Sequence, residues 1–159
     1  MIPSWLAIGV AATIIGYAVL KLNTRESIRW FNHQRRPQWL TFERLIPVIW
    51  ISIFICGAWS AYNVWEKEPS SVKTWFLMAF YALVEVAIML YNPVMGWFKS
   101  LRIGVWIGGF GFVLGAILAV LVFPVSLWGG LLLVPYLLWS PVGTYVTWVM
   151  DEINNTRSI

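Results

Sequence analysis

Glu85 is the residue of this chain whose type and position most directly suggest chemistry. It is the only ionisable residue well inside a long apolar segment. A charged side chain in hydrocarbon is costly, so such residues usually face a cavity or a polar partner. Two interpretations stay open. Glu85 provides a polar contact in a ligand pocket or a proton-linked step, or its protonated carboxyl group hydrogen-bonds to a neighbouring helix.

Other reactive residues are few. His33 is the only histidine and follows the first apolar segment, where we expect it to be exposed; as an axial ligand to a haem-like iron it would lack a second ligand. Cys56 is the only cysteine, so an intrachain disulfide is excluded. No Ser/His/Asp set, nucleotide-binding loop or metal cluster occurs. Familiar hydrolytic or redox chemistry has no residues to use, and no obligatory cofactor is expected.

Tryptophans are unusually frequent, with 12 in the chain. Trp50, Trp59 and Trp139 lie inside apolar segments, where an indole N–H needs a partner and a large flat ring needs a flat neighbour. Six others lie at segment ends, which is typical of an interfacial belt: Trp5, Trp65, Trp75, Trp97, Trp128 and Trp148. The interior indoles predict recognition of a flat apolar molecule within a helical bundle.

The elements that position these residues are membrane spans. Of the 159 residues, 60% are hydrophobic and 11% charged, whereas a soluble domain has about 25% charged residues. A helix needs about 20 apolar residues to cross a bilayer, and the apolar runs are continuous rather than alternating. The sequence predicts an all-α integral membrane bundle of five transmembrane helices in one domain, 1–159. The predicted spans are 3–20, 45–65, 74–91, 103–123 and 128–150.

Helix ends and connections follow from local signals. Pro93 and Pro124 are expected to end the third and fourth spans, because proline cannot continue a helix, and Ser126 is expected to start the fifth. Pro141 is expected to break the backbone near Trp139. The longest connection, 21–44, is expected to fold over one mouth of the bundle.

Positive charge predicts the orientation. Nine basic residues lie on one predicted side: Lys21, Arg25, Arg29, Arg35, Arg36, Arg44, Lys99, Arg102 and Arg157. Only Lys67 and Lys73 lie on the other. We therefore predict an N-terminus outside and a C-terminus in the cytoplasm. The net charge of +4 reflects this topology rather than binding to nucleic acid.

Small residues follow one face of the fourth span. Gly104, Gly108, Gly111 and Gly115 are spaced by four, three and four residues, which keeps them on one side of a helix. Such spacing lets two backbones approach closely. It predicts either packing within the bundle or the seam of a homodimer.

Specific motifs carry a resemblance. The fifth span contains Pro135-Tyr136-Leu137-Leu138-Trp139, and the first connection contains Trp30-Phe31 and Arg36-Pro37-Gln38-Trp39, followed by Pro47-Val48-Ile49-Trp50. Over nearly its whole length the chain resembles the TspO/MBR family, the tryptophan-rich sensory proteins related to the mitochondrial translocator protein.

The resemblance implies a pocket in the upper bundle, closed by the first loop. It implies binding of porphyrins, such as haem or protoporphyrin, and of other flat hydrophobic ligands, including sterols in some members, with roles in tetrapyrrole handling and stress response. Trp50 and Trp139 match two tryptophans needed for light-dependent porphyrin breakdown in some members. The ligand-binding residues expected on these grounds are Phe31, Trp39, Pro47, Trp50, Phe54, Tyr81, Glu85, Trp139 and Gly143.

The chain departs from the family pattern in places that bear on specificity. Phe31 stands where tyrosine is common, and Leu40-Thr41-Phe42 replaces a Pro-Pro pair after Trp39. Tyr81 and Glu85 lie about where many members have asparagines. A carboxyl group there could favour a ligand with an amine, a pyrrole N–H or a metal.

We therefore predict a tetrapyrrole-binding sensor, carrier or scavenger that forms a homodimer in the membrane lipid. Two alternatives stay open: a porphyrin or sterol transporter, and a structural membrane subunit that uses the glycine face.

Overall fold

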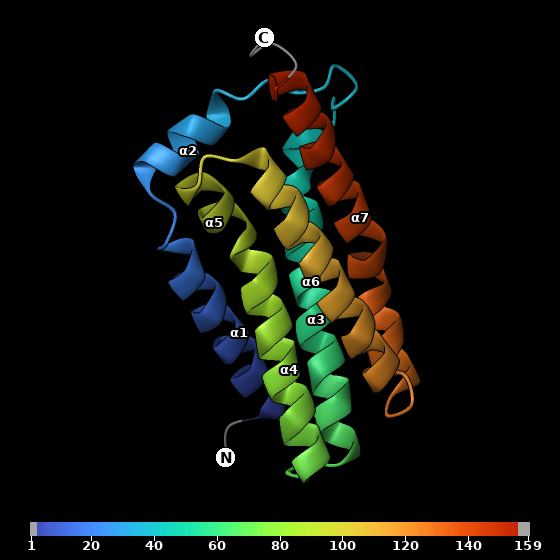
Figure 1. Ribbon diagram of the computed structural model, residues 1–159. Helices are drawn as coiled ribbons and strands as arrows, with labels where there is room; N and C mark the ends of the chain where they lie inside the picture. The colour runs from blue at the N-terminus through green and yellow to red at the C-terminus, as the bar shows by residue number, and fades with distance from the viewer. Residues whose placement is uncertain (1–2, 156–159) are drawn as a thin grey trace.

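The computed structural model describes residues 3–155 and is helical throughout its ordered elements (Figure 1). Arg157, included in the charge count, lies outside the described residues. The all-α prediction is confirmed. The elements are α1 (Ser4–Leu20), α2 (Arg25–Asn32), a 3-10 turn η1 (Glu43–Leu45), α3 (Ile46–Lys67), α4 (Val72–Met89), α5 (Tyr91–Trp97), α6 (Leu101–Val122) and α7 (Leu127–Asn155).

Among the described residues, four helices are long and apolar enough to cross a membrane by themselves: α3, α4, α6 and α7. The remaining predicted span, 3–20, corresponds to α1, which has 17 residues. It is therefore about 26 Å long, slightly less than a hydrocarbon core of about 30 Å. A 79° bend separates α1 from α2. If these two helices are counted together as one bent span, the number of spans is five. The chain is thus an integral membrane protein with four or five spans.

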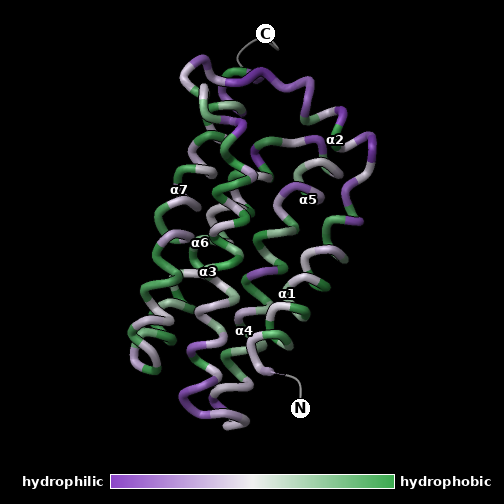
Figure 2. The backbone as a smooth tube through the Cα atoms, turned by 180° about the vertical axis from the view of Figure 1, so that it is seen from behind, coloured by the Kyte–Doolittle hydropathy of each residue, from purple (hydrophilic) through white to green (hydrophobic). Residues whose placement is uncertain are grey.

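Helices α6 and α7 make the most extensive contact of the bundle, and α3 packs beside α7 and α4 beside α6. Helix α1 packs across α3 and α4 (Figure 1). Seen from behind, hydrophilic residues gather at the two ends and hydrophobic residues cover most of the middle (Figure 2). Large apolar side chains such as Ile14, Ile55, Phe110 and Leu138 are exposed on the outer faces, as lipid contact requires.

Helix ends follow the predicted chemistry with two exceptions. The hydroxyl of Ser126 accepts a hydrogen bond from the Gly129 amide (3.1 Å) and so caps α7, while α6 ends just before Pro124. The third span ends earlier than predicted, at Met89, and Pro93 lies in the first turn of α5, where a missing N–H removes no bond. The predicted break at Pro141 is wrong, because α7 continues through Pro135 and Pro141.

The first connection covers one end of the bundle, beside the C-terminal end of α7. Its α2 packs against α5, and Thr24 caps it by accepting the Ser27 amide. Asn154 of α7 makes two hydrogen bonds with the backbone of Arg35, to its N–H (3.1 Å) and its C=O (3.2 Å). The first connection is therefore attached both to α5, through α2, and to the end of α7, through Arg35.

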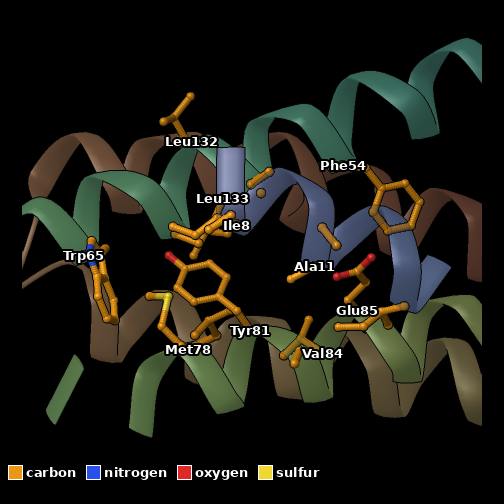
Figure 3. Close-up of a pocket in the computed structure, with 18 of the residues that line it drawn as sticks. Ile8, Ala11, Phe54, Trp65, Met78, Tyr81, Val84, Glu85, Leu132 and Leu133 are labelled. Carbon is orange, nitrogen blue, oxygen red and sulfur yellow. The ribbon is translucent and has the colours of Figure 1, made fainter. Parts of the chain in front are cut away.

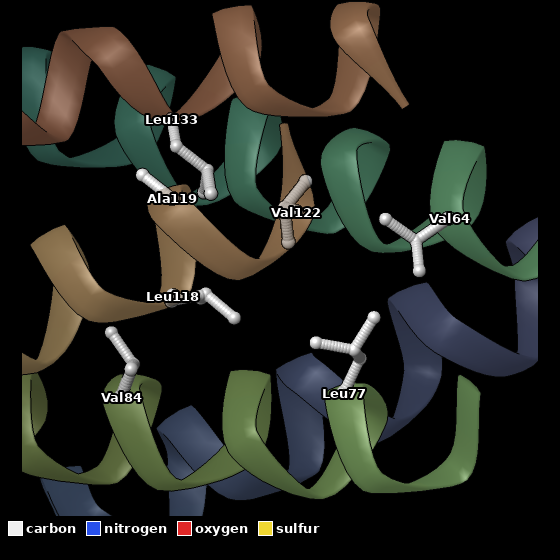
Figure 4. Close-up of a cluster of buried hydrophobic side chains, with 7 residues drawn as sticks. All are labelled: Val64, Leu77, Val84, Leu118, Ala119, Val122 and Leu133. Atoms are coloured by element: carbon white, nitrogen blue, oxygen red, sulfur yellow. The ribbon is translucent and has the colours of Figure 1, made fainter. Parts of the chain in front are cut away.

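Two apolar cores hold the helices together. The larger joins α3, α4, α6 and α7 through Val64, Leu77, Val84, Leu118, Ala119, Val122 and Leu133 (Figure 4). The smaller lies under the first connection and contains Leu40, Met95, Leu101, Val146 and Met150.

The glycine face of α6 is occupied within the chain. A Cβ added at Gly108 would lie 2.5 Å from Oγ1 of Thr144, and one at Gly115 would lie 2.1 Å from Cε1 of Tyr136, both on α7. Gly111 faces Tyr136 as well, and Gly104 faces Met95 and Thr147. These glycines let α6 and α7 approach closely. A homodimer seam would need another surface.

Candidate functional site

A cavity of about 820 Å³ lies between α1, α3 and α4, with α6 and α7 closing its back (Figure 3). Helix α1 contributes one face, formed by Ala7, Ile8, Ala11, Ala12 and Ile15. These positions repeat at helical spacing, so one side of α1 looks into the cavity while Trp5, Val10, Ile14 and Tyr17 are exposed outside. The cavity thus lies under the least tightly packed long helix.

Small side chains create this space. Gly57, Ala58 and Ala61 of α3 line the cavity opposite the alanines of α1. A Cβ added at Gly57 would meet nothing within 4 Å. This glycine therefore differs from Gly104, Gly108, Gly111 and Gly115 on α6, beside which neighbouring side chains fill the available space. The same residue type gives tight packing on one helix and a void on another.

Tyr81 brings a hydroxyl group to the cavity wall. Its oxygen lies 2.5 Å from Oγ of Ser60, which donates a hydrogen bond of 2.6 Å to the carbonyl oxygen of Gly129. Because Ser60 has one proton and uses it for Gly129, Tyr81 is the donor in the bond between the two hydroxyls. The Tyr81 oxygen keeps acceptor capacity, which a ligand N–H or O–H can use.

Glu85 points into the cavity between Ala11 and Phe54 (Figure 3). Within residues 3–155, no hydrogen bond or ion pair joins its carboxyl group to another side chain. Gly16 of α1 makes room for it, since a Cβ there would lie 3.7 Å from Oε1. Within the described residues, Glu85 therefore makes no hydrogen bond to a neighbouring helix, and the alternative of a contact in a ligand pocket fits its position better.

The cavity reaches the surface where α1 begins and α3 ends. Ser4 donates a hydrogen bond of 2.5 Å to Oε1 of Glu66, and both residues line the cavity. Trp65 and Trp75 meet edge to face there, with ring centroids 5.1 Å apart. At this end, the Ser4–Glu66 hydrogen bond therefore joins α1 to α3 beside an aromatic pair.

A separate aromatic cluster lies under the first connection. Phe42 meets Trp139 edge to face at 6.4 Å, and Trp39 is 6.5 Å from Phe42 and stacks on Tyr145 at 6.1 Å. The indole Nε1 of Trp139 is buried, and no hydrogen-bond partner for it exists among the described residues. The first connection therefore places its own aromatic rings against the α7 tryptophan.

Comparison with known proteins settles the family. The TspO/MBR family model matches residues 6–153. The chain belongs to the TspO/MBR family. It is 24% identical over 128 residues to the tryptophan-rich sensory protein of Cereibacter sphaeroides, covering 80% of this chain and 78% of the relative. It is 26% identical over 133 residues to the tryptophan-rich protein TspO of Bacillus cereus, covering 79% and 80%.

The residues expected from the TspO/MBR pattern fall into two places. Phe54, Tyr81 and Glu85 line the cavity. Trp50 does not, but its ring packs against two lining residues, Phe54 at 6.0 Å and Tyr136 at 6.4 Å. Trp139 does not line the cavity either. The two indoles that match the family's tryptophans needed for porphyrin breakdown thus pack against different aromatic side chains, Trp50 against Phe54 and Tyr136 and Trp139 against Phe42.

The remaining expected residues lie outside the cavity. Phe31 is covered by the guanidinium of Arg36, 4.7 Å from its centroid, and Trp39 is half exposed. Pro47 is exposed in the first turn of α3, and a Cβ at Gly143 would meet nothing within 4 Å. His33 is exposed, with Nδ1 2.7 Å from the carbonyl oxygen of Arg29. The described residues contain no cluster of three or more His, Cys, Asp or Glu side chains suited to a metal.

Several residues that line the cavity were not predicted from the sequence. Ala7 and Ala11 on α1, and Ser4 and Glu66 at the exposed end, carry no family motif. The sequence feature that could have indicated them is the spacing of small residues by four, at Ala7 and Ala11 and at Gly57 and Ala61. It indicates close helix approach as readily as a void.

Proposed function

We propose that this TspO/MBR protein is a membrane receptor or scavenger that binds a flat hydrophobic molecule in the cavity between α1, α3 and α4. The observation that carries the proposal is the cavity itself. Its volume of about 820 Å³ falls within the range of about 300–1,000 Å³ typical of small-molecule sites. Porphyrins such as protoporphyrin or haem are the ligands to test first, since the family resemblance implies them.

The lining suits a flat apolar ligand. Phe54, Trp65, Trp75, Tyr81 and Tyr136 give the walls aromatic faces, and Tyr81 adds an acceptor. Aromatic pairs contribute about 0.5–1.5 kcal/mol each beyond burial. A large planar ring that meets two or three of these side chains gains both burial and stacking.

A sensory role needs a ligand-dependent change. Helix α1 lies between the cavity and the outside, and Val19 is its only buried residue among those described. A ligand under α1 would favour the arrangements of α1 that leave room for it, which shifts the population of conformers. The names of both relatives, tryptophan-rich sensory protein and tryptophan-rich protein TspO, are compatible with this role.

The orientation is part of the proposal. The Glu26–Lys99 and Arg102–Asp151 pairs place the first connection, the α5–α6 junction and the end of α7 at one end of the bundle. Lys67 and Lys73 lie at the other end, around the α3–α4 connection. With positive charge inside, the first connection and C-terminus face the cytoplasm.

Glycine substitutions test where the ligand binds. Gly57→Leu should fill the cavity without a backbone clash and lower protoporphyrin affinity at least tenfold in the solubilised full-length chain. Gly109→Leu is the matched control, because a Cβ at Gly109 also meets nothing within 4 Å and this residue does not line the cavity. Absorbance titration measures both. If Gly143→Leu abolishes binding and Gly57→Leu does not, the ligand binds under the first connection and the proposed site is wrong.

A further inference from the structure

The cavity carries charge of one sign. Among the described residues that line it, only Glu66 and Glu85 are charged, and none is a lysine, arginine or histidine. Glu66 lies at the exposed end and already accepts a hydrogen bond from Ser4. Glu85 lies on the α4 face that looks toward Ala11 and Phe54 (Figure 3). Among the described lining residues, the only charged group without a partner is therefore an acid.

An acid in this place is expensive unless something binds it. Carboxyl groups within membrane spans are rare and usually pair with another polar group. Burial of a polar group without a hydrogen bond costs free energy that a partner restores. The lining side chains near Glu85 are apolar, namely Ala11, Phe54, Ala82 and Ile88. Within residues 3–155 no side chain donates a hydrogen bond to Glu85, so the donor is left for the ligand to bring.

We propose that the cavity selects hydrophobic ligands that carry an amine or another protonated nitrogen, and that Glu85 binds this nitrogen. The proposal rests on the function proposed above and names the ligand class for the same site. An ammonium beside Glu85 gains a charge-assisted hydrogen bond. Phe54 lies beside Glu85 and provides an aromatic surface for the flat part of such a ligand. Tyr81, one helical turn before Glu85 on α4, adds a hydroxyl group to the cavity wall at a separate point.

The same geometry disfavours ligands that bring a carboxylate into the cavity, whereas a porphyrin can leave its propionates in solvent at the exposed end. A carboxylate directed into the cavity would meet Glu85 at the inner part or Glu66 at the exposed end. No described basic side chain lines the cavity to compensate. Ligands of equal ring size should therefore bind in the order amine, neutral, acid.

Pyrene derivatives test this order, because one flat ring can carry three different groups. The probes are 1-pyrenemethylamine, 1-pyrenemethanol and 1-pyrenecarboxylic acid, titrated at pH 7 into the solubilised full-length chain with quenching of tryptophan fluorescence as the signal. The variants are Glu85→Gln and the control Glu68→Gln. Glu68 lies just after α3, is exposed and does not line the cavity.

In the unmodified chain we expect the amine to bind about ten- to one-hundredfold more tightly than the alcohol, from the strength of a hydrogen bond to a charged group. Glu85→Gln should remove this preference and leave alcohol affinity within about twofold. Glu68→Gln should change neither. Equal affinities for amine and alcohol, or a preference that survives Glu85→Gln, would overturn the inference about the ligand class. The proposed site would still be supported if the alcohol binds to the unmodified chain and Gly57→Leu abolishes that binding. If no pyrene binds, or Gly57→Leu has no effect on any, both proposals fail.

Discussion

The ring of Tyr136 on α7 lies directly against Gly115 on α6, so close that a Cβ at Gly115 would come within 2.1 Å of Cε1. Tyr136 also lines the cavity and supports the ring of Trp50. One glycine thus sets both the distance between two helices and the position of a cavity wall.

Gly115→Val should destabilise the fold by about 1–3 kcal/mol, because the added methyl groups push against an aromatic ring in a packed interface. Gly109→Val is the control on the same helix, since its Cβ would meet nothing within 4 Å. Thermal unfolding in detergent should show a lower midpoint for Gly115→Val than for Gly109→Val. Loss of an oligomer by size exclusion, with an unchanged midpoint, would instead indicate that the glycine face is a homodimer seam.

Trp50→Phe and Trp139→Phe should have different effects. Trp50 contacts Phe54 and Tyr136, so its loss should weaken protoporphyrin binding about two- to tenfold, the equivalent of one aromatic pair. Trp139→Phe should leave affinity unchanged, because Trp139 meets Phe42 and not the cavity. It should not lower the thermal midpoint either, because it removes a buried donor that has no partner.

Absorbance titration and illumination of the bound porphyrin measure both effects, affinity and photoproduct. If Trp139→Phe reduces either as much as Trp50→Phe does, the ligand lies between the two indoles. The first connection would then have to move Phe42 away from Trp139 before the ligand binds.

The helices were predictable from sequence because their signals are local. Four of the five apolar runs form helices long and apolar enough to cross a bilayer by themselves, and Pro124 and Ser126 mark where one helix ends and the next begins. The 3-10 turn and α2 within the first connection were not predicted, since short polar helices carry weak signals. The continuity of α7 through Pro141 shows that surrounding helices can hold a proline-containing helix together.

The cavity was only partly predictable because it depends on what faces each small residue. Gly115 and Gly57 look alike in sequence, yet Tyr136 fills the space beside the first and nothing fills the space beside the second. Spacing places residues on a face of a helix but does not say what lies opposite. Glu85 was identifiable from its rarity in a span. That Phe42 covers Trp139 depends on the path of a connection that spacing cannot give.

The pairing of Glu26 on α2 with Lys99 after α5 predicts a pH dependence for the first connection. The Lys99 ammonium lies 2.5 Å from Oε1 of Glu26, and this hydrogen bond and charge hold the pKa of Glu26 below its ordinary value of about 4.3. Because the folded-state pKa is the lower one, the pair stabilises the packing of α2 above the unfolded pKa. That stabilisation is lost as the pH falls through the folded pKa.

Hydrogen exchange of the α2 amides measures this effect when Glu26→Gln is compared with the unmodified chain at each pH, since the intrinsic exchange rates then cancel. At pH 6 and low salt the unmodified chain should be more protected, and the difference should disappear as the pH falls through the lowered pKa of Glu26. Both side chains are largely exposed, so the difference at pH 6 should be small and should shrink further in about 1 M salt. A difference that does not decrease as the pH is lowered would mean that Glu26 holds α2 by packing rather than by charge.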